Sequence, residues 1–246
     1  MRMSSRFRRI NRFIASVVIN LVVMNTVLAD NTAEDFYTWA GFEMTGSMSA
    51  NNSYLKNFRY KLFMQGRFGD SSSRFTQGLI RSGVGYTFSD KVTAWIGYDW
   101  VPTGRPLALR SFNDHAVWQQ LSLQENYPFG TASSRTRLEQ HFFDIPGSGD
   151  VAHLFRQMFK LSTPMRFVSP NTSLVIWNEI FANLNSTDAG TQSGFNQNRA
   201  FAGIGYGINK HLLLEIGYMN QYIHRRNNTR PDLMLHVMSV TMLLNF

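Results

Sequence analysis

The amino-acid sequence predicts an all-β fold: a transmembrane, antiparallel, up-and-down β-barrel that follows a signal peptide. Three observations predict it. Short segments that alternate apolar and polar residues recur along the chain, the amino terminus has the features of a secretory signal, and the last strand ends on an aromatic residue. Side chains of a strand point to opposite faces in turn, so each segment offers one face to lipid and one to an enclosed interior.

The carboxyl-terminal segment 233–246 has the clearest alternation. One face holds Met238, Val240, Met242, Leu244 and Phe246, whereas Ser239, Thr241 and Asn245 lie on the other. This pattern resembles the terminal strand of bacterial outer-membrane barrels, in which it is an insertion signal. We therefore expect Phe246, Leu244 and Met242 to be an assembly signal for the barrel assembly machinery, and the cell outer membrane to be the destination.

Residues 1–29 have the composition of a secretory signal peptide. They contain five arginines, no acid, an apolar stretch at 13–28 and a Val-Leu-Ala site before Asp30. An uncleaved membrane anchor is the alternative, but the stretch is short for a span and contains two asparagines. Cleavage leaves residues 30–246 as one barrel domain. It removes five positive charges, so the formal net charge falls from +8 to +3 and no nucleic-acid partner is expected.

The composition excludes several other kinds of site. The chain has no cysteine, so the mature protein has neither a disulfide nor a lipid-modified cysteine. Its six histidines lack the spacing of metal ligands, and no glycine-rich phosphate loop opens a helix. We expect no metal and no cofactor.

Segment 57–68 indicates which strand face meets lipid. Phe58, Tyr60, Leu62 and Met64 share one face, and Arg59, Lys61 and Arg67 share the other. A cation that faces lipid near the bilayer midplane costs about 2–4 kcal/mol. The register that turns these three cations to lipid is therefore excluded, and we expect them to line the lumen.

The same argument assigns faces to the segments at 76–88, 92–100, 116–126, 134–143, 154–162, 174–184, 199–208 and 212–222. The charged residues expected to line the lumen are Arg59, Lys61, Arg67, Arg81, Asp99, Arg135, Arg137, Glu139, Arg156, Lys160, Glu179, Arg199 and Glu215, together with Glu43. Nine of them are cations and five are acids, so the sequence predicts a mildly basic lumen.

The number of strands stays open between two values. Ten segments from residue 54 onward have clear strand patterns, and segment 35–46 has an eleventh. Because single-chain bacterial barrels have an even number of strands, we expect twelve strands, or ten if 35–46 does not cross fully. With Phe246 on the periplasmic side, the short turns near residues 90, 128 and 210 are periplasmic and the longer loops extracellular.

Several segments together resemble one family. They are RSGVGY at 81–86, WIGY at 95–98, SRTRLEQHF at 134–142, WNEIFANLN at 177–185, GFNQNRAFAGIGY at 194–206 and LEIGYMNQY at 214–222. In this order they resemble an uncharacterised family of Gram-negative outer-membrane β-barrel proteins, a domain of unknown function. The resemblance implies a barrel in that membrane and supplies no activity or catalytic residue.

Three functions remain open for such a barrel. Ion pairs could fill it as a structural barrel, or a porin-like narrow channel could favour anions, since rings of arginine and lysine select anions. The third is a lipid-modifying hydrolase of the phospholipase or lipid A deacylase type. It needs a nucleophile beside a base, and His141 with Glu139 are weak candidates because no serine motif accompanies them. A soluble secreted β-protein with a lipid-binding cavity is a further alternative.

The basic loop at 223–232 suggests a partner outside the cell. It holds Arg225, Arg226 and Arg230, and guanidinium groups bind phosphates well. Contact with the phosphates of lipopolysaccharide is one interpretation of this loop, and a solvated polar loop is the other. Outer-membrane lipids are the remaining expected partners.

Overall fold

The computed structural model describes residues 32–49, 54–225 and 231–246. The predicted signal peptide at 1–29 lies outside these residues. Eleven strands follow one another along the chain: β1 (Thr32–Ser47), β2 (Phe58–Gly69), β3 (Arg74–Ser89), β4 (Val92–Thr103), β5 (Phe112–Tyr127), β6 (Gly130–Phe143), β7 (Ala152–Pro164), β8 (Thr172–Asn183), β9 (Gly194–Gly207), β10 (Leu212–Ile223) and β11 (Asp232–Asn245). In this described part, no helix is long and apolar enough to cross a membrane.

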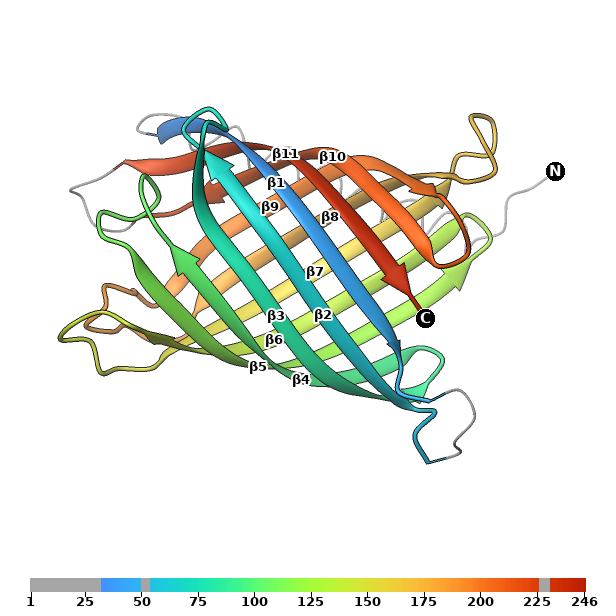
Figure 1. Ribbon diagram of the computed structural model, residues 1–246, viewed down its shortest axis with the longest axis horizontal. Helices are drawn as coiled ribbons and strands as arrows, with labels where there is room; N and C mark the ends of the chain where they lie inside the picture. Colours follow the sequence, from blue (N-terminus) through green and yellow to red (C-terminus); the bar gives the residue numbers. More distant parts are fainter. Residues whose placement is uncertain (1–31, 50–53, 226–230) are drawn as a thin grey trace, which may run out of the picture.

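The strands form one closed barrel in which each strand pairs with its neighbour in sequence (Figure 1). All of these sequential pairs are antiparallel, and β1 closes the barrel against β11 as a parallel pair. The predicted all-β, up-and-down barrel is therefore confirmed.

The expectation of twelve strands, or of ten, is wrong. Segment 35–46 lies within the full-length strand β1, which pairs with β11 from Thr32 to Thr45. Antiparallel neighbours alternate in direction, so the first and last of an odd number of strands run the same way. The parallel ladder satisfies their backbone groups and closes the wall at eleven.

The odd strand number places the two ends of the described chain at opposite ends of the barrel (Figure 1). We call the end that carries Phe246 the carboxyl end; its connections include the turns at 90–91, 128–129 and 208–211. The end that carries Thr32 is the amino end, with loops at 104–111, 144–151 and 184–193. Most of the shortest turns therefore lie at the carboxyl end of the barrel.

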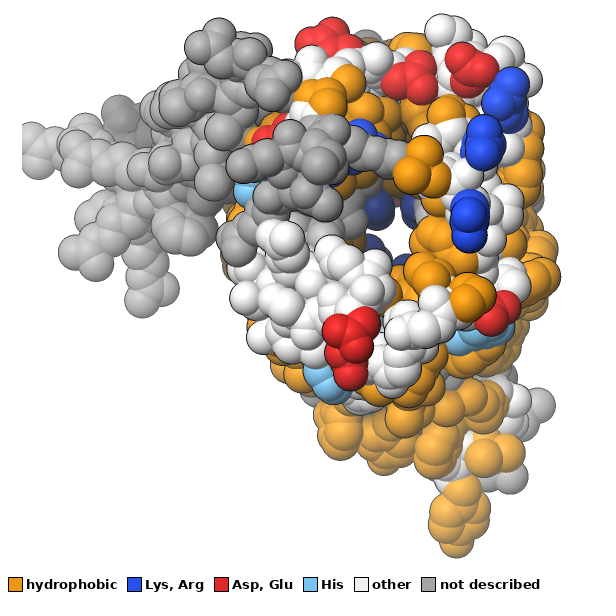
Figure 2. All heavy atoms as spheres, turned by 90° about the vertical axis from the view of Figure 1, so that its left-hand side faces the viewer, with side chains coloured by type: hydrophobic (Ala, Val, Ile, Leu, Met, Phe, Trp, Pro, Cys, Tyr) orange, Lys and Arg blue, Asp and Glu red, His pale blue; other side chains and the backbone are white. Residues whose placement is uncertain are grey.

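The wall separates apolar from charged side chains. Phe75, Val84, Ile96 and Phe159 are among the many large apolar residues that are exposed on the outside. Arg81, Arg137, Glu139 and Glu179 are among the buried charged residues. Figure 2 looks into the amino end and shows lysine and arginine side chains inside the opening, with apolar side chains over much of the visible outer wall.

Candidate functional site: the charged lumen

A cavity of about 780 Å³ occupies the lumen. Its lining includes Thr103 and Asn196 near the amino end, and Gln124 and Leu243 near the carboxyl end. One cavity thus has lining residues close to both ends of the barrel.

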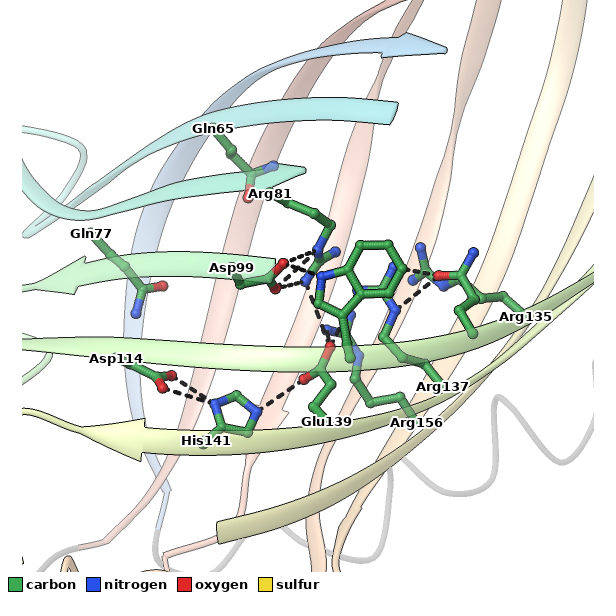
Figure 3. Close-up of polar contacts among 12 residues, drawn as sticks. Gln65, Gln77, Arg81, Asp99, Asp114, Arg135, Arg137, Glu139, His141 and Arg156 are labelled. Carbon is green, nitrogen blue, oxygen red and sulfur yellow. Dashed lines mark hydrogen bonds and ion pairs between the residues drawn. The ribbon is translucent and has the colours of Figure 1, made fainter. Parts of the chain in front are cut away.

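Glu139 of β6 is the hub of the charges in the middle of the lumen (Figure 3). Its Oε1 accepts hydrogen bonds from Arg156 Nη1 at 2.8 Å and Arg137 Nη1 at 3.2 Å. Arg81 Nη2 lies 3.6 Å from the same oxygen. Glu139 is only 2 % exposed, so this one buried carboxylate compensates several guanidinium groups at once.

Two further carboxylates complete the cluster. Asp99 accepts a forked pair of hydrogen bonds from Arg81, with Nε at 2.8 Å, and another from the indole Nε1 of Trp118 at 2.6 Å. Glu179 accepts from Arg156 Nε at 2.9 Å and from Arg135 Nη2 at 2.8 Å. Forked contacts of arginine with carboxylate are among the stronger hydrogen bonds in proteins, and they hold each side chain in one orientation.

His141 lies between two carboxylates. Its Nδ1 is 2.9 Å from both oxygens of Asp114, and its Nε2 is 3.1 Å from Glu139 Oε2 (Figure 3). Carboxylates only accept hydrogen bonds, so both ring nitrogens donate and the ring carries a positive charge. A general base needs a ring nitrogen with a free lone pair, and this arrangement leaves none. His141 and Glu139 therefore meet as an ion pair and not as a base beside a nucleophile.

Two lysine pairs lie nearer the carboxyl end. Lys61 Nζ is 3.2 Å from Glu43 Oε1, and both groups line the cavity. Lys160 of β7 reaches Glu215 of β10 at 2.5 Å, so this pair connects strands that are not neighbours in the wall. These contacts reduce the free cross-section of the lumen.

Two arginines of the lumen have no carboxylate partner among the described residues. Arg67 and Arg199 line the cavity, and each guanidinium lies against the indole ring of Trp39, at 3.9 Å and 5.0 Å from the ring centroid. All the ion pairs of the lumen described above involve other cations. The amino half of the cavity is therefore its most positive part.

The structure places the remaining sequence-predicted residues as follows. Arg59 shares the strand face of Lys61 but does not line the cavity. The ring of Phe246 stacks on that of His211 with 5.4 Å between the centroids, and both Phe246 and Met242 are exposed residues. Arg225 lies at the amino end, where its backbone N–H donates to Asp232 Oδ1 at 2.6 Å. Arg226 and Arg230 lie outside the described residues.

Sequence reasoning missed several residues of the lumen. Asp114 lies outside the predicted segment 116–126, because β5 begins at Phe112, four residues earlier. Trp39, Trp118 and the glutamines at 65, 77, 120, 197 and 221 are uncharged, so the charge argument did not select them. The signal that could have found them is strand parity: Gln65 is two residues from Arg67, and Gln197 is two residues from Arg199. Within the described residues, no group of three or more potential metal-binding side chains occurs.

Comparison with known proteins gives a family for the chain. Residues 36–232 match the family described as a protein of unknown function, DUF2490. The chain belongs to this family. It is also 30% identical over 194 residues to an uncharacterized protein of Methylorubrum extorquens, a match that covers 76% of this chain and 78% of the relative. No solved structure matches the chain. The matched range runs from β1 to the first residue of β11, so it includes the whole central cluster, and it assigns no activity.

Trp118 provides a first test of the central cluster. Its indole is fully buried and covers the backbone of Gly97, where an added Cβ would overlap the ring and the carbonyl of Ser82. We expect Gly97→Ala to displace Trp118 from Asp99 and to lower the free energy of unfolding by about 1–3 kcal/mol, the usual cost of overpacking. Near-ultraviolet circular dichroism and urea unfolding measure both effects.

The matched control is Gly207→Ala on β9, where the nearest atom to the new Cβ is the Asn171 carbonyl oxygen at 3.7 Å. This substitution should leave both signals close to wild type. Equal effects of the two substitutions would show that Trp118 is not held against Gly97.

Proposed function

We propose that this protein is a narrow outer-membrane channel that favours small anions. The observation that carries the proposal is the lumen cavity, whose lining reaches from one end of the barrel to the other and includes more cations than acids. Two features of the barrel support it separately: the apolar outer face supports insertion in a membrane, and the charged lumen supports a preference for anions.

The outer face of the barrel supports the membrane part. Soluble monomers rarely expose contiguous apolar surface beyond a few hundred Å². Here every strand carries at least one exposed large apolar residue, and on β7 this residue is Phe159. On β3 the aromatic residues Phe75 and Tyr86 are both exposed, and their partners on β2, Phe68 and Phe58, are ten residues apart because the ladder has a register shift next to Phe68. At about 3.4 Å per residue and about 40° of tilt, ten residues give about 26 Å of height, which suits an apolar band about 25 Å tall between aromatic girdles.

The dimensions of the cavity support a passage for small ions. Along β5 its lining runs from Phe112 to Gln124, which is about 30 Å along the barrel axis by the same rise and tilt. The hydrocarbon core of a bilayer is also about 30 Å thick. Spread over that length, the about 780 Å³ that the centres of water-sized molecules can occupy gives a mean cross-section of about 25 Å² for those centres. A cavity of this size has room for water and small ions.

The charge of the lining supports a preference for anions. Seven lysines and arginines and six carboxylates line the cavity, and the doubly donating ring of His141 adds an eighth positive charge. The surplus of two charges is carried mainly by Arg67 and Arg199, because the other cations have carboxylate partners. Rings of basic side chains attract anions and repel cations in a narrow pore.

Planar-bilayer recording of the purified protein tests the proposal. We expect discrete conductance steps and, in a potassium chloride gradient, a reversal potential that shows chloride to be more permeant than potassium. Heat-unfolded protein is the control. An absence of steps would contradict the channel and leave a barrel with a structural role, whereas a preference for potassium would contradict the charge argument.

A further inference from the structure

We propose that Arg67, Arg199 and Trp39 form a binding site in the lumen for a small oxyanion of the hydrogen phosphate class. This inference deepens the proposed function by naming the kind of ion. Binding can be measured in detergent without transport, so the site and the channel can fail separately.

Among the described residues, the hydrogen bonds and the ring contact of Arg67 come from neutral groups. Its Nε donates to Gln65 Oε1 at 2.8 Å, and its Nη1 donates to Gln77 Oε1. Its guanidinium carbon lies 3.9 Å from the centroid of a Trp39 ring. Amide oxygens and the π-face orient the guanidinium without cancelling its charge. The positive charge of Arg67 thus remains available to a ligand in the cavity.

Arg199 has the same kind of environment. Its guanidinium carbon lies 4.6 Å from the Phe181 ring centroid and 5.0 Å from a Trp39 ring centroid. Its Nη2 makes one long hydrogen bond, of 3.5 Å, to Gln197 Oε1, and its buried Nε has no hydrogen-bond partner. Glu179 faces Arg199 across the β8–β9 ladder, but its oxygens bond to Arg135 and Arg156. Arg199 therefore makes no ion pair of its own among the described residues, and its Nε is a free donor.

The carboxylates of the lumen are engaged by other cations. Glu139 and Glu179 bond to Arg137, Arg156 and Arg135, and Asp99 bonds to Arg81. A charge that is removed from bulk water without a partner is costly, so buried charges are normally paired. An anion from solution that sits between Arg67 and Arg199 would supply the missing negative charge.

Two further buried atoms have no hydrogen-bond partner within residues 32–49, 54–225 and 231–246, and they indicate which groups the anion carries. The indole Nε1 of Trp39 is buried and without a hydrogen-bond acceptor, so it can donate to a ligand oxygen. Oε1 of Gln221, which pairs with Arg199 in the β-ladder, is buried and without a donor. Hydrogen phosphate carries both acceptor oxygens and a hydroxyl, whereas sulfate has no hydroxyl to offer to Gln221. Phosphate is therefore expected to bind more tightly than sulfate.

Isothermal titration calorimetry of the folded full-length barrel in detergent tests the site, with inorganic phosphate as the probe and sulfate as the comparison. We expect one phosphate per barrel, and binding at least about tenfold weaker for the double variant Arg67→Gln, Arg199→Gln, since each arginine offers charge-assisted hydrogen bonds. Arg59→Gln is the matched control, because it removes a cation from the same face of β2 outside the cavity lining.

Thermal unfolding separates loss of binding from loss of folding. Because neither arginine has a carboxylate partner among the described residues, the substitutions remove unpaired buried charge, and the double variant should unfold at or above the wild-type temperature in phosphate-free buffer. Phosphate should raise the unfolding temperature of wild type and of Arg59→Gln, and leave that of the double variant unchanged. Absence of phosphate binding to wild type, or equal binding to the double variant, would overturn the site. Sulfate binding as tight as phosphate binding would overturn the hydrogen phosphate class.

Discussion

Glu139→Gln is expected to cost the barrel about 3–5 kcal/mol of its free energy of unfolding, the range for removing one partner of a buried ion pair. The substitution keeps the size of the side chain and removes its charge. It leaves Arg137 and Arg156 without the carboxylate oxygen that both contact, and it removes one of the two acceptors of His141. Urea unfolding in lipid vesicles, followed by heat-modifiable migration on gels, measures the change.

Glu125→Gln is the control for this substitution. Glu125 pairs with Lys91 at 2.8 Å, but the side chains of both residues are about half exposed. Exposed ion pairs contribute about 0–1 kcal/mol, so this variant should unfold close to wild type. If the two variants unfold at the same urea concentration, Glu139 is not the electrostatic hub that its contacts indicate.

The local pattern of the chain was sufficient to find the strands. Alternation has a period of two residues and is visible within one segment, so the predicted segments at 57–68, 92–100 and 212–222 overlap β2, β4 and β10 almost completely. The cost of exposing a cation to lipid then assigned a face to each strand. Arg81 and Glu179 could be assigned to the lumen because each lies among residues with clear alternation.

The closure of the barrel could not be predicted in the same way. Whether β1 pairs with β11, and in which direction, depends on contacts between residues about 200 positions apart. Without knowledge of the β1–β11 pairing, the rule that bacterial barrels have an even number of strands was used, and it predicted the wrong number of strands. Partners across the lumen are equally non-local: Lys160 and Glu215 are 55 residues apart, and no spacing in the sequence relates them.

The proposed anion site combines two arginines with residues that carry no charge. Gln65 and Gln77 have the same parity as the lumen cations of their strands, but a glutamine on a strand does not by itself indicate either face. The structure shows that both glutamines hydrogen-bond to Arg67. A carboxylate at either position would neutralise the charge of this arginine. The count of charged residues predicted a basic lumen, and the arrangement of the neutral amides indicates which part of the lumen holds the unpaired positive charge.

Cysteine labelling of intact cells tests the proposed crossing of the outer membrane, and its expected result is all-or-none. The chain has no cysteine, so single substitutions can be labelled without background. Gly149→Cys in the 144–151 loop is exposed, and a Cβ there meets nothing within 4 Å. Asp90→Cys lies in an exposed turn at the carboxyl end. With that end in the periplasm, a membrane-impermeant maleimide should label Gly149→Cys and leave Asp90→Cys unlabelled until the cells are broken.

Glu34→Cys, near the start of β1, distinguishes eleven strands from an even number. Glu34 is largely exposed and contacts His236 only at 3.5 Å, so its loss should not disturb the wall. Because β1 and β11 are parallel, Glu34 lies at the amino end, opposite Phe246, and Glu34→Cys should be labelled in intact cells together with Gly149→Cys. In an even-numbered barrel the first strand would begin on the periplasmic side, so a site near its start would be protected. Labelling of Gly149→Cys without Glu34→Cys would therefore contradict the parallel closure, and labelling of Asp90→Cys alone would invert the orientation.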